Sequence, residues 1–236
     1  MSKDKKIKYY TYELDMKLLN TLAIVLFIII GSMVWLIERK DLYTVHLDTI
    51  SFFIWMFLWL IIHELLHGIG FLLFKNVKKE NLTFGMFLER GVFYCMCKQK
   101  IGKKEILTSL LFPLTIIGII TLLIGISINH YELVFLSILN ITSSIGDIIM
   151  SIYFLKTPKD IIYLDLDDCT SFAVLSKIDL KQIKVPGIHL RTTGIYDEKT
   201  MYSKDKRKLV ISKASYILII FIFILLLFNI IGGVKT

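Results

Sequence analysis

The amino-acid sequence predicts an all-α polytopic membrane protein, with about five transmembrane helices and small β-rich cytoplasmic insertions. Of its 236 residues, 55% are hydrophobic, and the mean hydropathy of +0.67 is too high for a soluble domain of this size. Apolar runs long enough to cross a bilayer recur along the chain. These runs are Leu18–Ile37, Ile50–Phe74, Glu105–Ile128, Leu133–Leu155 and Ala214–Val234.

The basic residues set the expected orientation of these spans. They give a net charge of +8 and cluster before the first span, between residues 75 and 104, and between residues 156 and 213. The intervening loops are poor in lysine and arginine, which is the positive-inside pattern. We therefore expect a multi-pass protein of the cytoplasmic membrane with a cytoplasmic N-terminus. Its basic residues would contact anionic lipid of the bilayer, and no nucleic acid. The isoleucine- and lysine-rich composition is typical of a low-GC bacterium.

These patterns divide the chain into four parts. We expect a cytoplasmic N-terminal segment (1–17), a four-helix transmembrane core (18–155), a cytoplasmic β-rich segment (156–213) and a C-terminal transmembrane helix (214–236). Within the core, the cytoplasmic loop 75–104 contains two β-prone runs on either side of Glu89-Arg90-Gly91 and is predicted to form a β-hairpin.

Further local signals refine this picture. Residues Ile161–Ser176 are β-rich, and Val185-Pro186-Gly187 and Arg191-Thr192-Thr193-Gly194 are turn signals. Pro113 lies near the start of the third apolar run, where it predicts a kink or an opening of the helix.

The sequence His63-Glu64-Leu65-Leu66-His67 lies inside the apolar run 50–74. On a helix, positions i and i+4 share one face, so the two imidazoles can bind one metal ion. Glu64 lies beside them, where it can act on a metal-bound water. Acidic and basic groups in hydrocarbon cost about 2.5–3.5 kcal/mol each. Three ionisable groups in little more than one turn therefore indicate metal chemistry within the membrane.

A catalytic zinc site usually has three protein ligands, so a third must come from another helix. Asp147 is the acidic residue well inside the run 133–155. At about 1.5 Å per residue, Asp147 lies about 12 Å from the cytoplasmic end of its helix, and His67 and His63 lie about 10 and 16 Å from the end of theirs. The three side chains are therefore predicted to meet at one depth. We predict His63, His67 and Asp147 as metal ligands, with Glu64 as the catalytic residue.

These motifs resemble those of the Putative zincin peptidase family of integral membrane proteins. That family is related to the site-2 proteases in the arrangement of its motifs. The matching features span roughly residues 55–175. They are the histidine pair followed by Gly68-Ile69-Gly70-Phe71, then Tyr94-Cys95, Leu111-Phe112-Pro113, and Gly146-Asp147 followed by Pro158. The resemblance implies zinc held by His63, His67 and Asp147, with Glu64 as general base. It also implies that the hairpin, around Phe84–Phe93, holds an extended substrate by β-augmentation. The chain departs from the site-2 protease pattern after Asn140, where glycine precedes Asp147 instead of following it.

The expected function is a zinc-dependent intramembrane or juxtamembrane metallopeptidase that hydrolyses a peptide or membrane-protein substrate. Zinc lowers the pKa of its water toward 7, and Glu64 passes the proton from the water to the leaving amine. Two alternatives stay open. One is a non-catalytic membrane-bound binding or regulatory protein that retains the peptidase-like fold. The other is a metal or ion transporter, for which more intramembrane acidic groups would be expected.

Three further motifs are weaker indications of a functional site. Asn140 precedes Asp147 by two turns on the same helix face, and interhelical hydrogen bonding is favoured there over contact with a ligand or substrate. Cys95-x-Cys97 lacks a second cysteine pair, so a zinc ribbon is not expected. Asp165-x-Asp167-Asp168 lacks the glycine and distal glutamate of a calcium loop and predicts a solvated turn.

Overall fold

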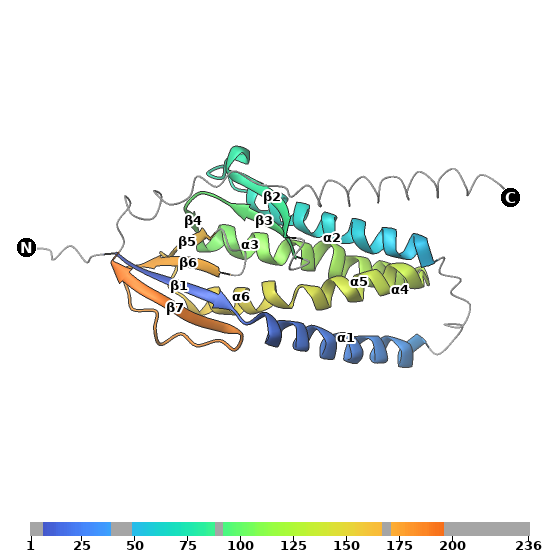
Figure 1. Cartoon of the computed structure of the whole chain (residues 1–236). Coiled ribbons are helices and arrows are strands. Elements are labelled where there is room, and N and C mark those ends of the chain that lie inside the picture. Colours follow the sequence, from blue (N-terminus) through green and yellow to red (C-terminus); the bar gives the residue numbers. More distant parts are fainter. Residues whose placement is uncertain (1–6, 39–48, 88–91, 167–170, 196–236) are drawn as a thin grey trace, which may run out of the picture.

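The computed structural model of the protein describes residues 7–38, 49–87, 92–166 and 171–195, and it has a mixed α/β fold (Figure 1). The predicted all-α class is wrong, because seven strands in the described part of the chain form two antiparallel sheets. The strands are β1 (Lys8–Leu14), β2 (Leu82–Phe87), β3 (Val92–Cys97), β4 (Ile101–Gly102), β5 (Ile162–Asp165), β6 (Ser171–Ser176) and β7 (Ile188–Ile195). The larger sheet lies at one end of the helices.

The helices run side by side away from this sheet (Figure 1). They are α1 (Met16–Glu38), α2 (Thr49–Leu72), α3 (Lys103–Pro113), the π-helix η4 (Leu114–Ile120), α4 (Thr121–Ser127), α5 (Tyr131–Ser143) and α6 (Ile145–Lys156), with a short 3-10 turn η2 (Lys79–Asn81). The π-helix begins directly after Pro113, at the position where the sequence predicts an opening of the helix.

The five-stranded sheet has the order β4-β5-β6-β1-β7, so the N-terminal segment supplies an interior strand. Tyr10 of β1 pairs with Val174 of β6, a partner far away in sequence. Local patterns do not reveal such pairings, and for this reason the sheet was not predicted. Residues 191–194, predicted as a turn, instead lie in β7, where Thr192 pairs with Thr11. Their β-branched threonines fit a pleated strand.

The smaller sheet is the predicted hairpin. Strands β2 and β3 pair antiparallel, with Phe84 opposite Cys95 and Leu82 opposite Cys97. This pairing confirms the hairpin expected in the loop 75–104. Residues 88–91, which include the whole predicted turn Glu89-Arg90-Gly91, lie outside the described residues.

Three helical stretches are long and apolar enough to cross a membrane: Met16–Met33, Ile54–Leu72 and Lys103–Ser127. The predicted run 133–155 is not one straight helix, because α5 and α6 meet at a 46° bend around Ser144. Counted as one broken span, this pair makes a fourth. The predicted C-terminal helix 214–236 lies outside the described residues.

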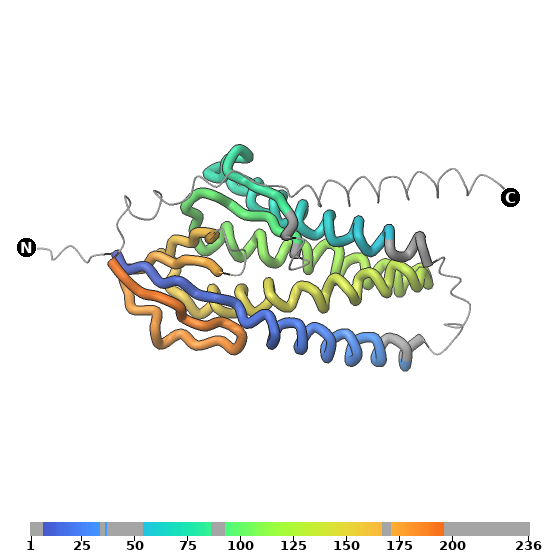
Figure 2. Tube along the Cα trace, in the orientation of Figure 1, coloured from blue at the N-terminus to red at the C-terminus, as the bar shows by residue number. Residues whose placement is uncertain are grey.

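A short junction joins the larger sheet to the first helix. Asp15 accepts a hydrogen bond from the Leu18 N–H at 3.0 Å and so caps α1, while its own N–H donates to the Gly187 carbonyl at 2.9 Å. Gly187 has a φ of +83°, which favours glycine at this turn. The tube in Figure 2 therefore passes from β1 straight into α1.

An aromatic cluster packs the larger sheet against α6. The ring of Tyr12 lies 4.8 Å from that of Tyr153, and the rings of Phe154 and Phe172 lie 5.6 Å apart, all four fully or almost fully buried. Aromatic side chains bury more apolar surface than most, so this cluster anchors α6 on the sheet. The anchoring positions the aspartate that α6 carries.

Candidate metal centre

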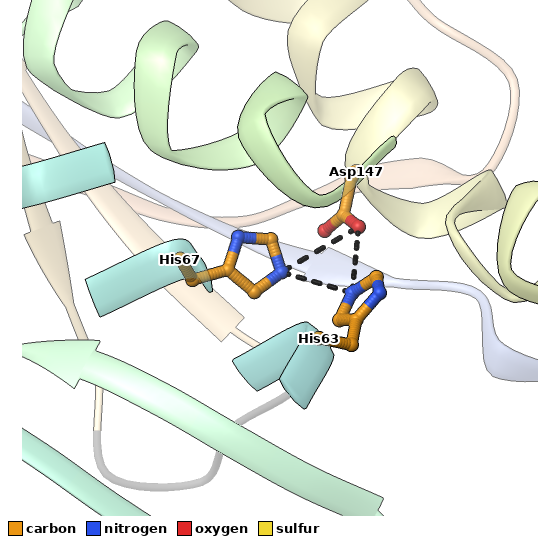
Figure 3. A group of neighbouring side chains, drawn as sticks. All are labelled: His63, His67 and Asp147. Carbon is orange, nitrogen blue, oxygen red and sulfur yellow. Dashed lines mark hydrogen bonds and ion pairs between the residues drawn. The ribbon is translucent and has the colours of Figure 1, made fainter. Parts of the chain in front are cut away.

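Helix α2 places His63 and His67 one turn apart on one buried face. The two residues are only 8% and 7% exposed, and their Nε2 atoms lie 3.1 Å apart (Figure 3). The i, i+4 spacing alone brings the two rings together, as expected for a helix. The two histidines therefore form one side of a candidate metal site.

Helix α6 supplies the third side chain. The bend around Ser144 places Asp147 in the first turn of α6, with its Oδ2 atom 3.3 Å from His63 Nε2 and 3.6 Å from His67 Nε2. Among the described residues, these three side chains form a group whose possible ligand atoms all lie within 4.8 Å of one another, close enough to hold a metal ion. The structure thus brings together the three predicted ligands.

The size of this triangle suits zinc. Ligand atoms at about 2.0–2.1 Å from a tetrahedral zinc lie about 3.3 Å from one another. The three observed separations are 3.1, 3.3 and 3.6 Å, so the atoms match one face of such a tetrahedron. Catalytic zinc sites combine three protein ligands of this kind with a water or substrate in the fourth position.

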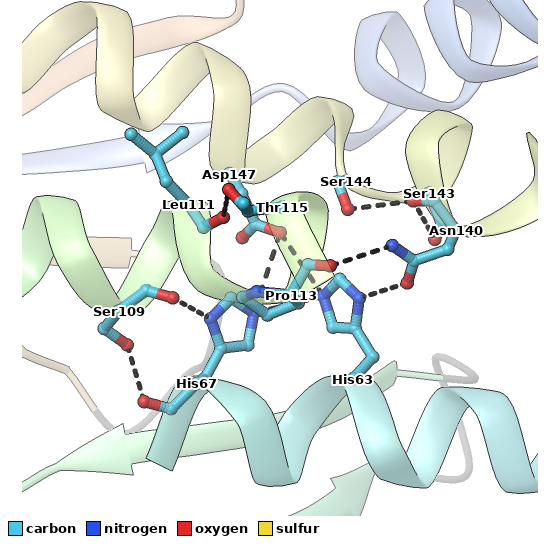
Figure 4. A network of polar contacts seen from close by, with 10 residues as sticks. All are labelled: His63, His67, Ser109, Leu111, Pro113, Thr115, Asn140, Ser143, Ser144 and Asp147. Carbon is cyan, nitrogen blue, oxygen red and sulfur yellow. Dashed lines mark hydrogen bonds and ion pairs between the residues drawn. The ribbon is translucent and has the colours of Figure 1, made fainter. Parts of the chain in front are cut away.

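Hydrogen bonds on the far side of each ring define its tautomer (Figure 4). His67 Nδ1 lies 2.8 Å from the Ser109 carbonyl oxygen, which can only accept, so Nδ1 carries the hydrogen. His63 Nδ1 likewise donates to Asn140 Oδ1 at 2.8 Å. In the neutral imidazoles both Nε2 atoms present lone pairs, and they face each other and a carboxylate oxygen. These three atoms are the donor types that zinc binds, so the residues fit a metal ion.

Glu64 lines the same cavity, and the N–H of Cys95 in β3 donates to its carboxylate. The hairpin can approach α2 this closely because position 68 is glycine. A Cβ atom at Gly68 would lie 2.5 Å from the ring of Phe84 and 3.5 Å from the sulfur of Cys95. The hairpin thus positions the predicted catalytic glutamate through its backbone.

The cavity has a volume of about 220 Å³ and reaches from the metal centre to the larger sheet. Its walls include apolar side chains of α2, α3 and α6, together with Tyr94, Tyr163 and Asp165 from the strands. The prediction of a solvated turn at Asp165 is wrong, because its carboxylate accepts hydrogen bonds from the Cys97 N–H and the Tyr163 hydroxyl. Asp165 shares a strand face with Tyr163, a period-two signal that could have indicated this burial. Asp167 and Asp168 lie outside the described residues.

The two cysteines of β3, Cys95 and Cys97, lie close to the cavity. Burial raises the pKa of the Cys97 thiol to about 11 and also raises the pKa of Cys95, so both stay neutral thiols at neutral pH. Both are free cysteines. Cys95 lies near the Glu64 and Asp165 carboxyl groups.

The sequence was only partly informative about the groups that orient the ligands. Asn140 was expected to bond between helices, and it does so, since its Nδ2 donates to the Pro113 carbonyl at 3.4 Å. It also contacts a predicted ligand, His63, which the sequence did not favour. The role of Ser109 was missed, although a proline four residues later is a recognisable signal for a free carbonyl.

Comparison with known protein families agrees with this geometry. Residues 56–162 match the model of the family described as Putative zincin peptidase, and the matched segment contains His63, Glu64, His67 and Asp147. No significant match is found among curated proteins or among solved structures. The match supports a metallopeptidase, a hydrolase that uses zinc. The relation to site-2 proteases stays a prediction.

Proposed function

We propose that this protein is a zinc-dependent metallopeptidase that hydrolyses peptide bonds of membrane-associated substrates. One observation carries the proposal: two histidine Nε2 atoms and one aspartate oxygen converge within 3.6 Å, beside Glu64 in the same cavity. The family match over residues 56–162 supports the same class of enzyme.

His63, His67 and Asp147 would hold the zinc ion. When bound, zinc supplies a Lewis acid that activates water and polarises the peptide carbonyl. Glu64 accepts a proton from the attacking water as the bond between the water oxygen and the carbonyl carbon forms. It then delivers that proton to the leaving nitrogen as the C–N bond breaks. The Cys95 N–H, which donates to the Glu64 carboxylate, would help to position it.

The proposed setting is the cytoplasmic half of the bacterial cytoplasmic membrane. His63 and His67 lie in the C-terminal half of α2, which runs toward the strands (Figure 1), and basic residues cluster in the segment 75–104 that follows α2. By the positive-inside rule this segment would face the cytoplasm. A membrane-anchored peptide chain could then reach the cavity from the bilayer or its surface, and the substrate would be a peptide or a membrane protein.

The substitution Glu64→Gln tests this function. We expect purified Glu64→Gln in proteoliposomes to keep its zinc and to lose cleavage of a peptide library by at least about 100-fold, because general acid–base catalysis contributes about 10²–10⁴-fold. Glu132→Gln, at an exposed position at the start of α5, is the matched control and should cleave like the wild type. Wild-type protein that binds zinc but cleaves no peptide or membrane-protein substrate would favour a non-catalytic binding protein.

A further inference from the structure

Pro113 lies where the third span changes from α3 to the π-helix η4. Two backbone carbonyls at this point, those of Ser109 and Pro113, take part in contacts to the metal centre (Figure 4). Backbone carbonyls inside a helix normally accept from the N–H four residues later. The hydrogen bonds that these two carbonyls accept from side chains therefore need a structural explanation.

For Ser109, the cause is the residue four positions later. That residue is Pro113, which has no N–H and whose ring displaces the carbonyl at i−4. The freed Ser109 oxygen accepts the Nδ1–H of His67 at 2.8 Å. It comes within reach because position 70 of α2 is glycine, and a Cβ there would lie 2.8 Å from Ser109 Cα.

The carbonyl of Pro113 acts on the other histidine. It accepts from Asn140 Nδ2 at 3.4 Å, which leaves Asn140 Oδ1 facing the Nδ1–H of His63 at 2.8 Å. Without a fixed acceptor for Nδ2, the amide could turn over and present a donor to His63. Gly118 leaves room for the amide, since a Cβ there would lie 3.2 Å from Asn140 Nδ2.

We propose that Pro113 is a positioning residue for both histidine ligands: its missing N–H frees the Ser109 carbonyl for His67, and its own carbonyl orients Asn140 toward His63. This inference rests on the metal centre of the proposed function and adds the device that sets both tautomers. Groups that hold the second nitrogen of a metal-bound histidine typically contribute 10–100-fold to metal affinity.

The test measures zinc affinity of the detergent-purified protein by competition with a chelator. In Pro113→Ala, the new N–H competes for the Ser109 carbonyl, and we expect the affinity to fall about 10–100-fold. Thr115→Ala is the matched control: its exposed hydroxyl donates to the Leu111 carbonyl at the same bend, so affinity should stay at the wild-type level.

A second pair of variants keeps the test informative if Pro113→Ala does not fold. Asn140→Leu removes the acceptor for His63 and should lower zinc affinity about 10–100-fold, whereas Asn140→Asp keeps a carboxylate acceptor and should restore it to within about threefold of wild type. A merely structural role of Asn140 would not give this pattern of rescue. Nitrogen-15 NMR of the metal-free protein should also show a hydrogen on Nδ1 of both histidines in the wild type, and a loss of this tautomer for His67 in Pro113→Ala.

These variants distinguish a failure of the metal centre from a failure of the positioning role of Pro113. If His63→Ala keeps wild-type zinc affinity, the metal centre itself is wrong, and the proposed function falls with it. If His63→Ala loses zinc while Pro113→Ala and Asn140→Leu bind as tightly as wild type, the centre stands and the positioning role of Pro113 is overturned.

Discussion

The backbone N–H of Cys97 donates to Asp165 Oδ2 at 2.7 Å, and this bond joins the hairpin to the larger sheet. Two residues earlier in the same strand, the N–H of Cys95 donates to Glu64. The edge of β3 that faces the cavity therefore has two of its amides taken by carboxylates. A substrate strand could not pair with these amides unless the carboxylates moved, which restricts β-augmentation there to other positions of the hairpin.

The Asp165 contact predicts a pH dependence of stability. Burial raises the pKa of Asp165 to about 6, although hydrogen bonds from the Tyr163 hydroxyl and the Cys97 N–H oppose the shift. Because this pKa lies above the value of about 3.9 in an unfolded chain, the contribution of Asp165 to stability is full below pH 4 and is lost as the pH rises through 6. Asp165→Asn should therefore raise the thermal unfolding temperature more at pH 7.5 than at pH 4.5. An equal effect at both pH values would contradict the buried state of this carboxyl.

The close approach of α2 and α3 predicts a size limit at Gly70. A Cβ at this position would lie 2.8 Å from Ser109 Cα, a backbone atom that cannot move aside cheaply. Gly70→Ala should lower the stability by about 1–3 kcal/mol, measured by thermal unfolding in detergent. Gly31 in α1 has nothing within 4 Å of such a Cβ, so Gly31→Ala is the control. It should be neutral or stabilising by up to about 1 kcal/mol, because alanine favours a helix. Equal losses in both variants would show that helix packing at Gly70 is not the cause.

Lys103 ties the start of α3 to the end of α6. Its Nζ donates to the carbonyls of Leu155 at 3.1 Å and Thr157 at 2.6 Å. We expect Lys103→Met to cost about 1–2 kcal/mol, because it removes two hydrogen bonds from a charged donor at a helix C-terminus. Lys104→Met, at the exposed neighbouring position, should unfold at the wild-type temperature. Indistinguishable unfolding curves for the two variants would remove this role from Lys103.

The candidate metal centre could be predicted from the sequence because its two histidines are related by the local spacing of a helix. Helical spacing brings His63 and His67 together, and the constant rise per residue places Asp147 at their depth. The paired β-prone runs of the hairpin are equally local. In contrast, the interior strand β1 pairs with segments near the other end of the described chain, and no local period reveals such a partner. The wrong all-α class follows from this limit.

The contacts around the ligands were harder to foresee for a related reason. The bend around Ser144 and the path from Pro113 through Asn140 to His63 depend on which helices lie side by side. Apolar periodicity indicates that a helix is buried, but it does not indicate which other helices pack against it. Only the proline carried a readable signal, since its missing N–H must free a carbonyl four residues earlier.

The zinc content of the purified protein tests the central claim most directly. Elemental analysis of wild type, Asp147→Ala and the exposed control Asp160→Ala should be made on the same detergent preparation. We predict about one zinc ion per chain in the wild type and the control, and little or none in Asp147→Ala, because two histidines alone do not complete a zinc site. Wild-type zinc content in Asp147→Ala would contradict the metal centre formed by His63, His67 and Asp147.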